Sequence, residues 1–188
     1  DMIGRDEQLA EKLWKNLPDL LVDSTETILP MIDVSGSMFG LPLSVAVALG
    51  MYLAERNKSE FKDTFLTFSE HPELVRLKGD TIAEKFRNIS QADWGMNTDF
   101  EAAYRHILDR AVRFKVDPDS MPTMLLVLSD MQFDESQSNA GGSFKTHYSW
   151  MEEEYRAAGY PFPKIVFWNL EAHAGTPAQC SDNNVGMV

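Results

Sequence analysis

Cysteine is nearly absent from this sequence of 188 residues, which contains Cys180 alone. A single cysteine excludes an internal disulfide and a zinc site built from several cysteines. Long apolar runs are missing too, because no stretch approaches the roughly 20 residues that a membrane-spanning helix needs. No charged and apolar leader opens the chain. We therefore expect a cytoplasmic, intracellular domain that does not cross a membrane.

Basic residues are in deficit. The sequence has 17 Lys and Arg against 29 Asp and Glu, which gives a formal net charge of -12. The basic residues are scattered and form no stripe of the kind that neutralises phosphates. We therefore expect no direct binding of nucleic acid by this domain.

Helical and strand-like stretches alternate along the chain, which is typical of an α/β fold with an open, doubly wound, mostly parallel sheet and helices on both faces. Pro30 is unexpected within the first strand, because a central strand normally excludes proline. The predicted units are an N-terminal helical extension, residues 1–24, and one domain, residues 25–188, whose final helix is absent. The predicted strands are Thr27–Asp33, Phe65–Phe68, Glu73–Leu77, Met124–Leu128, Ile165–Leu170 and Asn184–Val188, and the predicted helices are Glu7–Asn16, Leu43–Arg56, Thr98–Phe114 and one through Glu152–Ala158.

Oxygen-bearing side chains follow two of the predicted strands. Asp33, Ser35 and Ser37 are spaced two residues apart after the first strand, Asp130 ends a buried strand, and Thr98 lies in a loop that enters a helix. Ligands of an open α/β sheet bind at the carboxyl ends of neighbouring strands whose connections run opposite ways. If these two strands are neighbours, the five side chains face one crevice.

Two carboxylates and three hydroxyls suit a hard cation. Mg²⁺ prefers oxygen ligands in octahedral geometry, and Mn²⁺ is a possible substitute, whereas zinc prefers His and Cys. The five side chains supply fewer than six strong direct ligands, which leaves a position for an outside ligand. The predicted site is therefore a magnesium centre that an external carboxylate can complete.

These residues resemble a known site. The run DVSGSM at residues 33–38, Thr98 in MNTDF and Asp130 in LSDMQFD are together similar to the metal-ion-dependent adhesion site of von Willebrand factor A domains. The resemblance implies the Rossmann-like fold of that family and a protein partner that donates an Asp or Glu to the metal. It further implies direct ligation by Ser35 and Ser37, direct or switchable ligation by Thr98, and water-mediated or orienting roles for Asp33 and Asp130.

A narrower resemblance rests on the stretches WGMNTDF, LSDMQFD and VFWNL. They are similar to a group of uncharacterised proteins whose carboxyl-terminal part is such a domain. Ro-type ribonucleoprotein autoantigens are similar in carrying one behind an RNA-binding helical-repeat region. The resemblance covers roughly Thr27–Val188 and implies a ribonucleoprotein-related setting.

Each side chain also has an alternative interpretation. Ser35 and Ser37 could cap the helix that follows them, since serine is a favoured N-cap. Thr98 could form a capping box with Glu101. Asp130 could be a solvated acid in a loop.

Three other functions stay open. One is phosphoryl transfer from an Asp at the end of the first strand with Mg²⁺, although a resemblance to such enzymes would require a second Asp at the position of Ser35. Ser37, Asp130 and either His147 or His173 occur in the chain order of an α/β-hydrolase triad, although Ser37 lacks the flanking glycines of a nucleophile elbow. The domain could also be a scaffold in an RNA-protein particle. We expect a binding module rather than an enzyme, with no catalytic residues.

Overall fold

A single mixed sheet organises the chain. The computed structural model describes residues 2–67, 69, 71–90, 99–130, 144–170 and 185–187. In this part of the chain six strands follow the order β3-β2-β1-β4-β5-β6, and all neighbours are parallel except β2 and β3. The predicted α/β class and mostly parallel sheet are confirmed. The strands are β1 (Ile28–Ile32), β2 (Thr64–Thr67), β3 (Leu74–Arg76), β4 (Met124–Ser129), β5 (Lys164–Asn169) and β6 (Val185–Met187).

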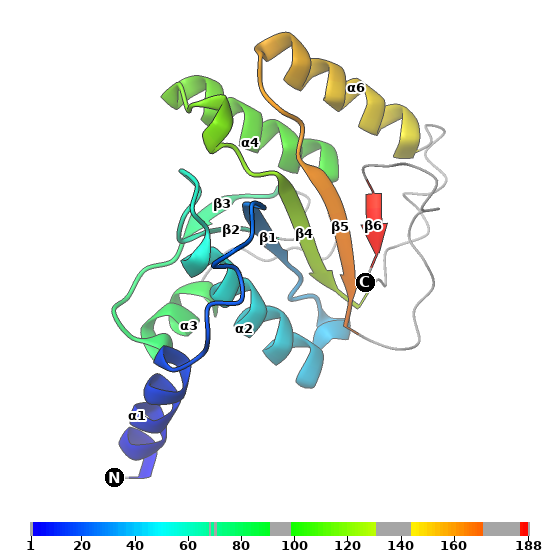
Figure 1. The fold of residues 1–188 in the computed structure, drawn as a ribbon. Coiled ribbons are helices and arrows are strands. Elements are labelled where there is room, and N and C mark those ends of the chain that lie inside the picture. The colour runs from blue at the N-terminus through cyan, green and yellow to red at the C-terminus, as the bar shows by residue number, and fades with distance from the viewer. Residues whose placement is uncertain are drawn as a thin grey trace.

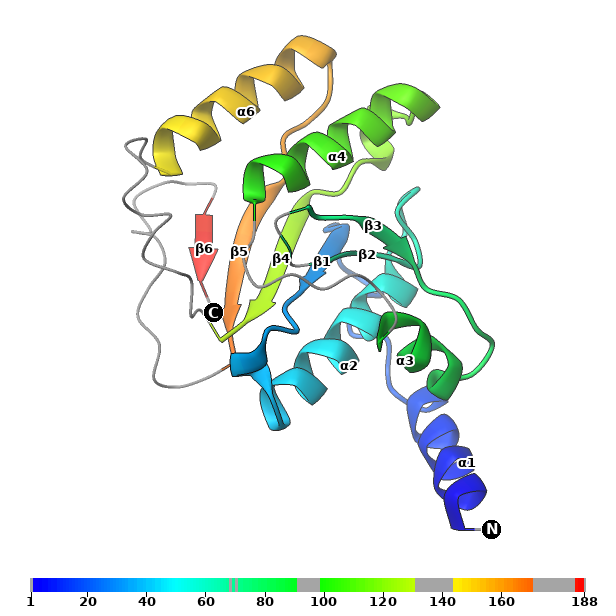
Figure 2. The same ribbon diagram turned by 180° about the vertical axis from the view of Figure 1, so that it is seen from behind.

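Helices cover both faces of this sheet. Figures 1 and 2 show α2 and α3 on one face and α4 and α6 on the other. Successive strand residues point to opposite faces, so Leu125 and Val127 of β4 enter the core under α4 and α6, whereas Leu126 and Leu128 enter the core under α2 and α3. The helices are α1 (Met2–Lys15), α2 (Leu41–Arg56), α3 (Ile82–Ser90), α4 (Phe100–Phe114) and α6 (Phe144–Ala158), with short 3-10 turns η1 (Gly36–Met38) and η2 (Pro118–Ser120).

Pro30 lies in a central strand without interrupting the sheet. The backbone N–H groups of alternate strand residues face opposite neighbours, and the N–H of Asp33 donates to the Leu128 carbonyl of β4 at 3.0 Å. A backbone N–H at position 30 would therefore point toward β2, and the pairing of β1 with β2 begins only at Met31. The missing N–H of Pro30 removes no ladder hydrogen bond, which explains why this strand tolerates it.

Helix α2 packs very close to β1. Ala46, Gly50 and Ala54 are buried at four-residue intervals, which places them on one face of the helix. A Cβ atom at Gly50 would lie 2.3 Å from Cδ1 and 2.6 Å from Cγ1 of Ile32. The absence of a side chain at Gly50 thus sets the distance between α2 and the strand that leads to Asp33.

We expect Gly50→Val to destabilise the domain by about 1–3 kcal/mol, because overpacking forces neighbouring side chains and backbone to shift. Urea unfolding followed by circular dichroism would measure the change. Ala48→Val is the matched control, since Ala48 is exposed on the same helix and should lose less than about 0.7 kcal/mol through helix propensity. Equal losses in the two variants would contradict the close packing.

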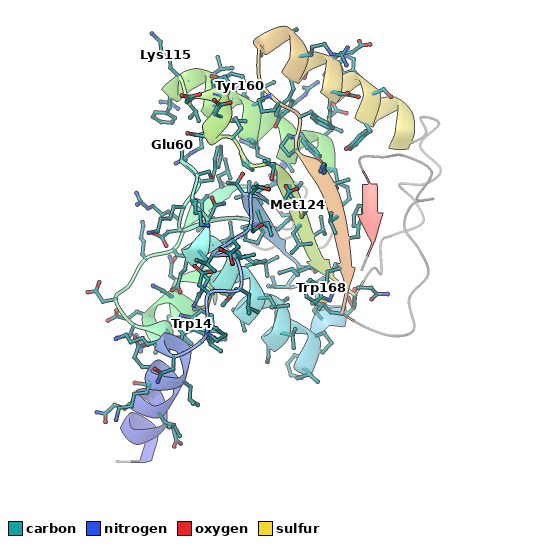
Figure 3. All side chains as sticks on the ribbon, viewed as in Figure 1. Trp14, Glu60, Lys115, Met124, Tyr160 and Trp168 are labelled. Atoms are coloured by element: carbon teal, nitrogen blue, oxygen red, sulfur yellow. The ribbon has the colours of Figure 1, made fainter. Side chains whose placement is uncertain are left out.

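The N-terminal segment is attached to α2 by side-chain hydrogen bonds. Trp14 Nε1 donates to Glu55 Oε2 at 2.9 Å, and Figure 3 shows Trp14 where α1 meets the layer of α2 and α3. The Tyr52 hydroxyl donates to the Pro18 carbonyl and accepts from the Leu20 N–H, both at 2.8 Å. The boundary between extension and domain at residues 24 and 25 stays a prediction.

In the described part of the chain, no helix combines the length and the apolar character that crossing a membrane requires.

Candidate functional site

The predicted site lies at the switch point of the sheet. The chain passes from β1 to β2 on one side and from β4 to β5 on the other, and β1 and β4 are neighbours in the centre. Ile32 is in register with Leu128, so Asp33 and Asp130, which follow the two strands, lie at the same carboxyl edge. Figure 1 shows the short segment that joins β1 to α2 beside the arrowheads of β4 and β5. This is the place where open α/β sheets bind ligands.

Asp33 is buried and held at both carboxylate oxygens. Its side chain is 2% exposed. Oδ1 accepts the backbone N–H of Ser35 at 2.8 Å, and Oδ2 accepts the Ser129 hydroxyl at 2.5 Å. The carboxylate therefore has a fixed orientation, and it also fixes the start of the loop that carries the two serines.

The electrostatics of this position disfavour a negative charge. Burial raises the pKa of the Asp33 carboxyl above its ordinary value, hydrogen bonds from Ser129 and Ser35 lower it, and the nearby charge of Asp130 raises it. The hydrogen-bond donors that partly offset burial are neutral groups. A cation at this edge of the sheet would stabilise the charged form of Asp33.

Neither serine hydroxyl is used to cap a helix. Ser35 is the N-cap of η1, but its side chain makes no capping hydrogen bond, and the N-cap of α2 is Gly40 rather than a serine. The Oγ atoms of Ser35 and Ser37 instead lie 3.0 Å apart and hydrogen-bond to each other. The capping interpretation of both serines was wrong, and their oxygens are positioned as a pair.

Asp130 is fully buried, with 0% of its surface exposed. The interpretation as a solvated loop acid was therefore wrong. Its charge contributes to the raised pKa of Asp33, so the two carboxylates act on one another across the β1–β4 pair. Four of the five predicted side chains thus lie on two segments that leave adjacent strands at one edge.

Thr98, the fifth predicted residue, falls outside the described residues, and so do His173 and the side chain of His147. The N-cap of α4 is Asp99, whose Oδ1 accepts the Ala102 N–H at 2.9 Å. This moves the cap one residue beyond the predicted capping box.

Ser129 is the residue of the site that sequence reasoning missed. Its hydroxyl is buried and donates to Asp33. The signal was the register: one step beyond the pair Ile32 and Leu128, parallel strands place position 129 beside position 33. A polar residue directly after the apolar run MLLVL is informative once that pairing is known.

The chemistry of these side chains fits a hard cation. Two buried carboxylates and a pair of adjacent hydroxyls are oxygen ligands of the type that Mg²⁺ prefers. Within the described ranges, no three His, Cys, Asp or Glu side chains gather into a group that could hold a metal ion. The predicted ligand set is of a different kind, because it combines serine hydroxyls with carboxylates.

Comparison with known families gives a direct match. Residues 27–188 match the model of the family described as Domain of unknown function (DUF7788). The chain belongs to this family. The match contains Asp33, Ser35, Ser37, Ser129 and Asp130, so the whole described site lies within the DUF7788 domain.

Two longer proteins are similar to this DUF7788 chain. Uncharacterized protein L728 of Acanthamoeba polyphaga mimivirus is 32% identical over 184 residues, which are 97% of this chain and 32% of that protein. The crystal structure of the Deinococcus radiodurans RO (RSR) protein has a similar fold, with a TM-score of 0.57 and 18% identity, over 93% of this chain and 33% of that one. The chain spans about a third of each, and the resemblance to Ro-type proteins is confirmed at the level of the fold.

Proposed function

We propose that the DUF7788 domain is a divalent-metal-dependent binding module that uses Mg²⁺ to hold a carboxylate of a partner protein. The observation that supports the proposal most strongly is that two buried carboxylates, Asp33 and Asp130, follow adjacent strands at the edge of the sheet where two serine hydroxyls cap no helix. Burying carboxylates is costly unless a cation or hydrogen bonds compensate for the lost hydration. The resemblance to a metal-ion-dependent adhesion site supports the same interpretation.

Each side chain has a defined part in this proposal. The Ser35 and Ser37 hydroxyls are the direct ligands, and Asp33 orients their loop by accepting the Ser35 N–H. Ser129 holds the second oxygen of Asp33, while Asp130 supplies the second negative charge. Thr98 would add a further hydroxyl. When bound, the metal supplies a positive centre with an open position for an external carboxylate.

The net charge of the chain explains why a metal would be needed. With a formal charge of -12, the domain repels an acidic partner at low ionic strength. A bound cation reverses the sign of the potential at one point of the surface. The partner's carboxylate is thereby directed to the edge of the sheet.

Isothermal titration with Mg²⁺ tests the proposal. We expect the wild-type domain to bind one ion and Ser35→Ala plus Ser37→Ala to lose detectable binding, because both direct ligands are removed. Ser120→Ala is the matched control, since Ser120 lies in η2, before β4 and thus near the opposite edge of the sheet. Undiminished binding by the double variant would refute the proposed ligands.

We propose a binding role rather than catalysis for Ser37. Its hydroxyl forms a hydrogen bond with that of Ser35, an arrangement that suits paired ligands better than a single activated nucleophile. A fluorophosphonate probe would distinguish the two roles. Covalent labelling that Ser37→Ala removes would instead support the hydrolase alternative.

A scaffold role in an RNA-protein particle is the second alternative, favoured by the fold shared with the RO (RSR) protein. The charge of -12 argues against direct contact with RNA, because phosphates are repelled. Filter binding at low salt would test this. Tight, salt-sensitive retention of RNA by the domain would overturn the choice of a protein partner.

A further inference from the structure

Two large apolar side chains are exposed beside the proposed metal site. Phe39 is 87% exposed and Leu41 is 76% exposed, and Phe39 has the highest exposed fraction among the described large apolar side chains. Phe39 follows directly on η1, the turn that contains Ser37, and Leu41 begins α2 two residues later. Position 39 is two residues from Ser37, so the two Cα atoms are at most about 7.6 Å apart.

The segment that carries the exposed Phe39 side chain is held in place by its neighbours. Met38, immediately before Phe39, is completely buried in the core under α2. The Phe39 N–H donates to the Gly36 carbonyl at 3.3 Å. With Met38 fixed inside and its neighbour tied to the turn, the Phe39 side chain is directed away from the core.

The next residues hold Leu41 in the same manner. Gly40 has a φ angle of 100°, a backbone conformation that residues with a side chain strongly disfavour. The N–H and the hydroxyl of Ser44 both donate to the Gly40 carbonyl, at 3.3 and 3.1 Å, and Pro42 occupies the first turn of α2. Leu41 therefore begins a helix whose orientation is set by the core, with its own side chain left in solvent.

We infer that Phe39 and Leu41 form an apolar rim that selects the segment bound at the metal. The inference rests on the proposed function. Its occupant is a partner segment in which an Asp or Glu stands one or two positions from a large apolar side chain. In an extended segment such positions lie about 3–7 Å apart along the chain, which matches the short separation between Ser37 and Phe39.

Charge explains why the selection would depend on apolar contact. The metal can hold any accessible carboxylate, and a domain of net charge -12 disfavours further acidic residues in the partner. Selectivity among carboxylates must then come from the surface beside the ion. On the η1 side that surface includes the exposed side chains of Phe39 and Leu41, and covering one large side chain changes an affinity by about tenfold or more.

A random peptide library displayed on phage tests the inference. The wild-type domain is immobilised with Mg²⁺, and bound phage are eluted with EDTA. We expect enriched peptides with an acidic residue next to Leu, Ile, Phe or Trp. When the same library is selected on the Phe39→Ser plus Leu41→Ser variant, the acidic residue should still be enriched, whereas the apolar neighbour should not. A peptide selected on the wild-type domain should bind this double variant about tenfold more weakly. Titration with Mg²⁺ should give the same metal affinity for the double variant and the wild-type domain.

Leu9→Ser plus Leu13→Ser is the matched control, because both side chains are more than half exposed on α1 and should not affect peptide choice. Acidic peptides without an apolar neighbour, or an apolar preference that the Phe39 and Leu41 variant retains, would overturn the rim and leave the proposed function standing. Failure to recover any peptide that needs Mg²⁺ would contradict the proposed function and, with it, the rim.

Discussion

Replacing Asp33 by Asn is expected to remove Mg²⁺ binding and to make the metal-free domain more stable. The negative charge of Asp33 is buried next to that of Asp130, and burial raises its pKa, so the charged form costs free energy when no cation is present. Asparagine keeps an acceptor for the Ser35 N–H, and its amide can donate to Ser129. For a domain of this size, each 1 kcal/mol gained raises Tm by about 2–4 °C.

Thermal unfolding in EDTA and titration with Mg²⁺ measure the two parts of this expectation. Asp119→Asn is the control, because Asp119 is an exposed acid in η2 and its loss should change neither quantity much. A lower Tm for Asp33→Asn in EDTA would show that the hydrogen bonds of the carboxylate outweigh its burial. Normal Mg²⁺ affinity would show that Asp33 is not needed for the ion.

Saturating Mg²⁺ is expected to stabilise the wild-type domain strongly. A ligand that binds only the folded state adds about 2.7 kcal/mol when its concentration is a hundred times Kd, which corresponds to a rise in Tm of about 5–10 °C at this chain length. Mn²⁺ should have a similar effect, since it accepts the same oxygen ligands. Differential scanning fluorimetry over a series of metal concentrations would measure it.

The control for this experiment must separate specific binding from charge screening. A chain with a net charge of -12 gains stability from any salt that screens its self-repulsion. NaCl at equal ionic strength should therefore give a smaller shift, and Asp130→Asn should respond to Mg²⁺ only as it does to NaCl. Equal shifts with the two salts in the wild-type protein would argue against a bound ion.

The sheet was largely predictable because β1, β2 and β4 are buried along almost their whole length. The run MLLVL of β4 is continuous and apolar, and it forms the centre of the sheet with β1 and β5. Pro30 was the misleading signal. Whether a proline disrupts a strand depends on which neighbour its N–H would face and where that neighbour's pairing begins, and neither can be found before the strand order is known.

Local choices near the site were harder to predict. Threonine and aspartate are both good N-caps, so the sequence could not decide between Thr98 and Asp99, and the structure selects Asp99. Helix α3, absent from the prediction, is short and mostly polar. The role of Ser129 can be predicted only when the register between β1 and β4 is known, and that register depends on contacts between residues far apart in the sequence.

The N-terminal segment has a consequence for how the limits of this domain should be drawn. Trp14 and Leu21 pack against the core under α2, and Lys58, just after α2, donates to the carbonyls of Leu21 and Val22 at 3.0 and 2.8 Å. Residues 27–188, which match the family model, are therefore packed against a segment that precedes them in the chain. In related chains, residues upstream of the first strand should vary in concert with the end of α2, even though they lie outside residues 27–188.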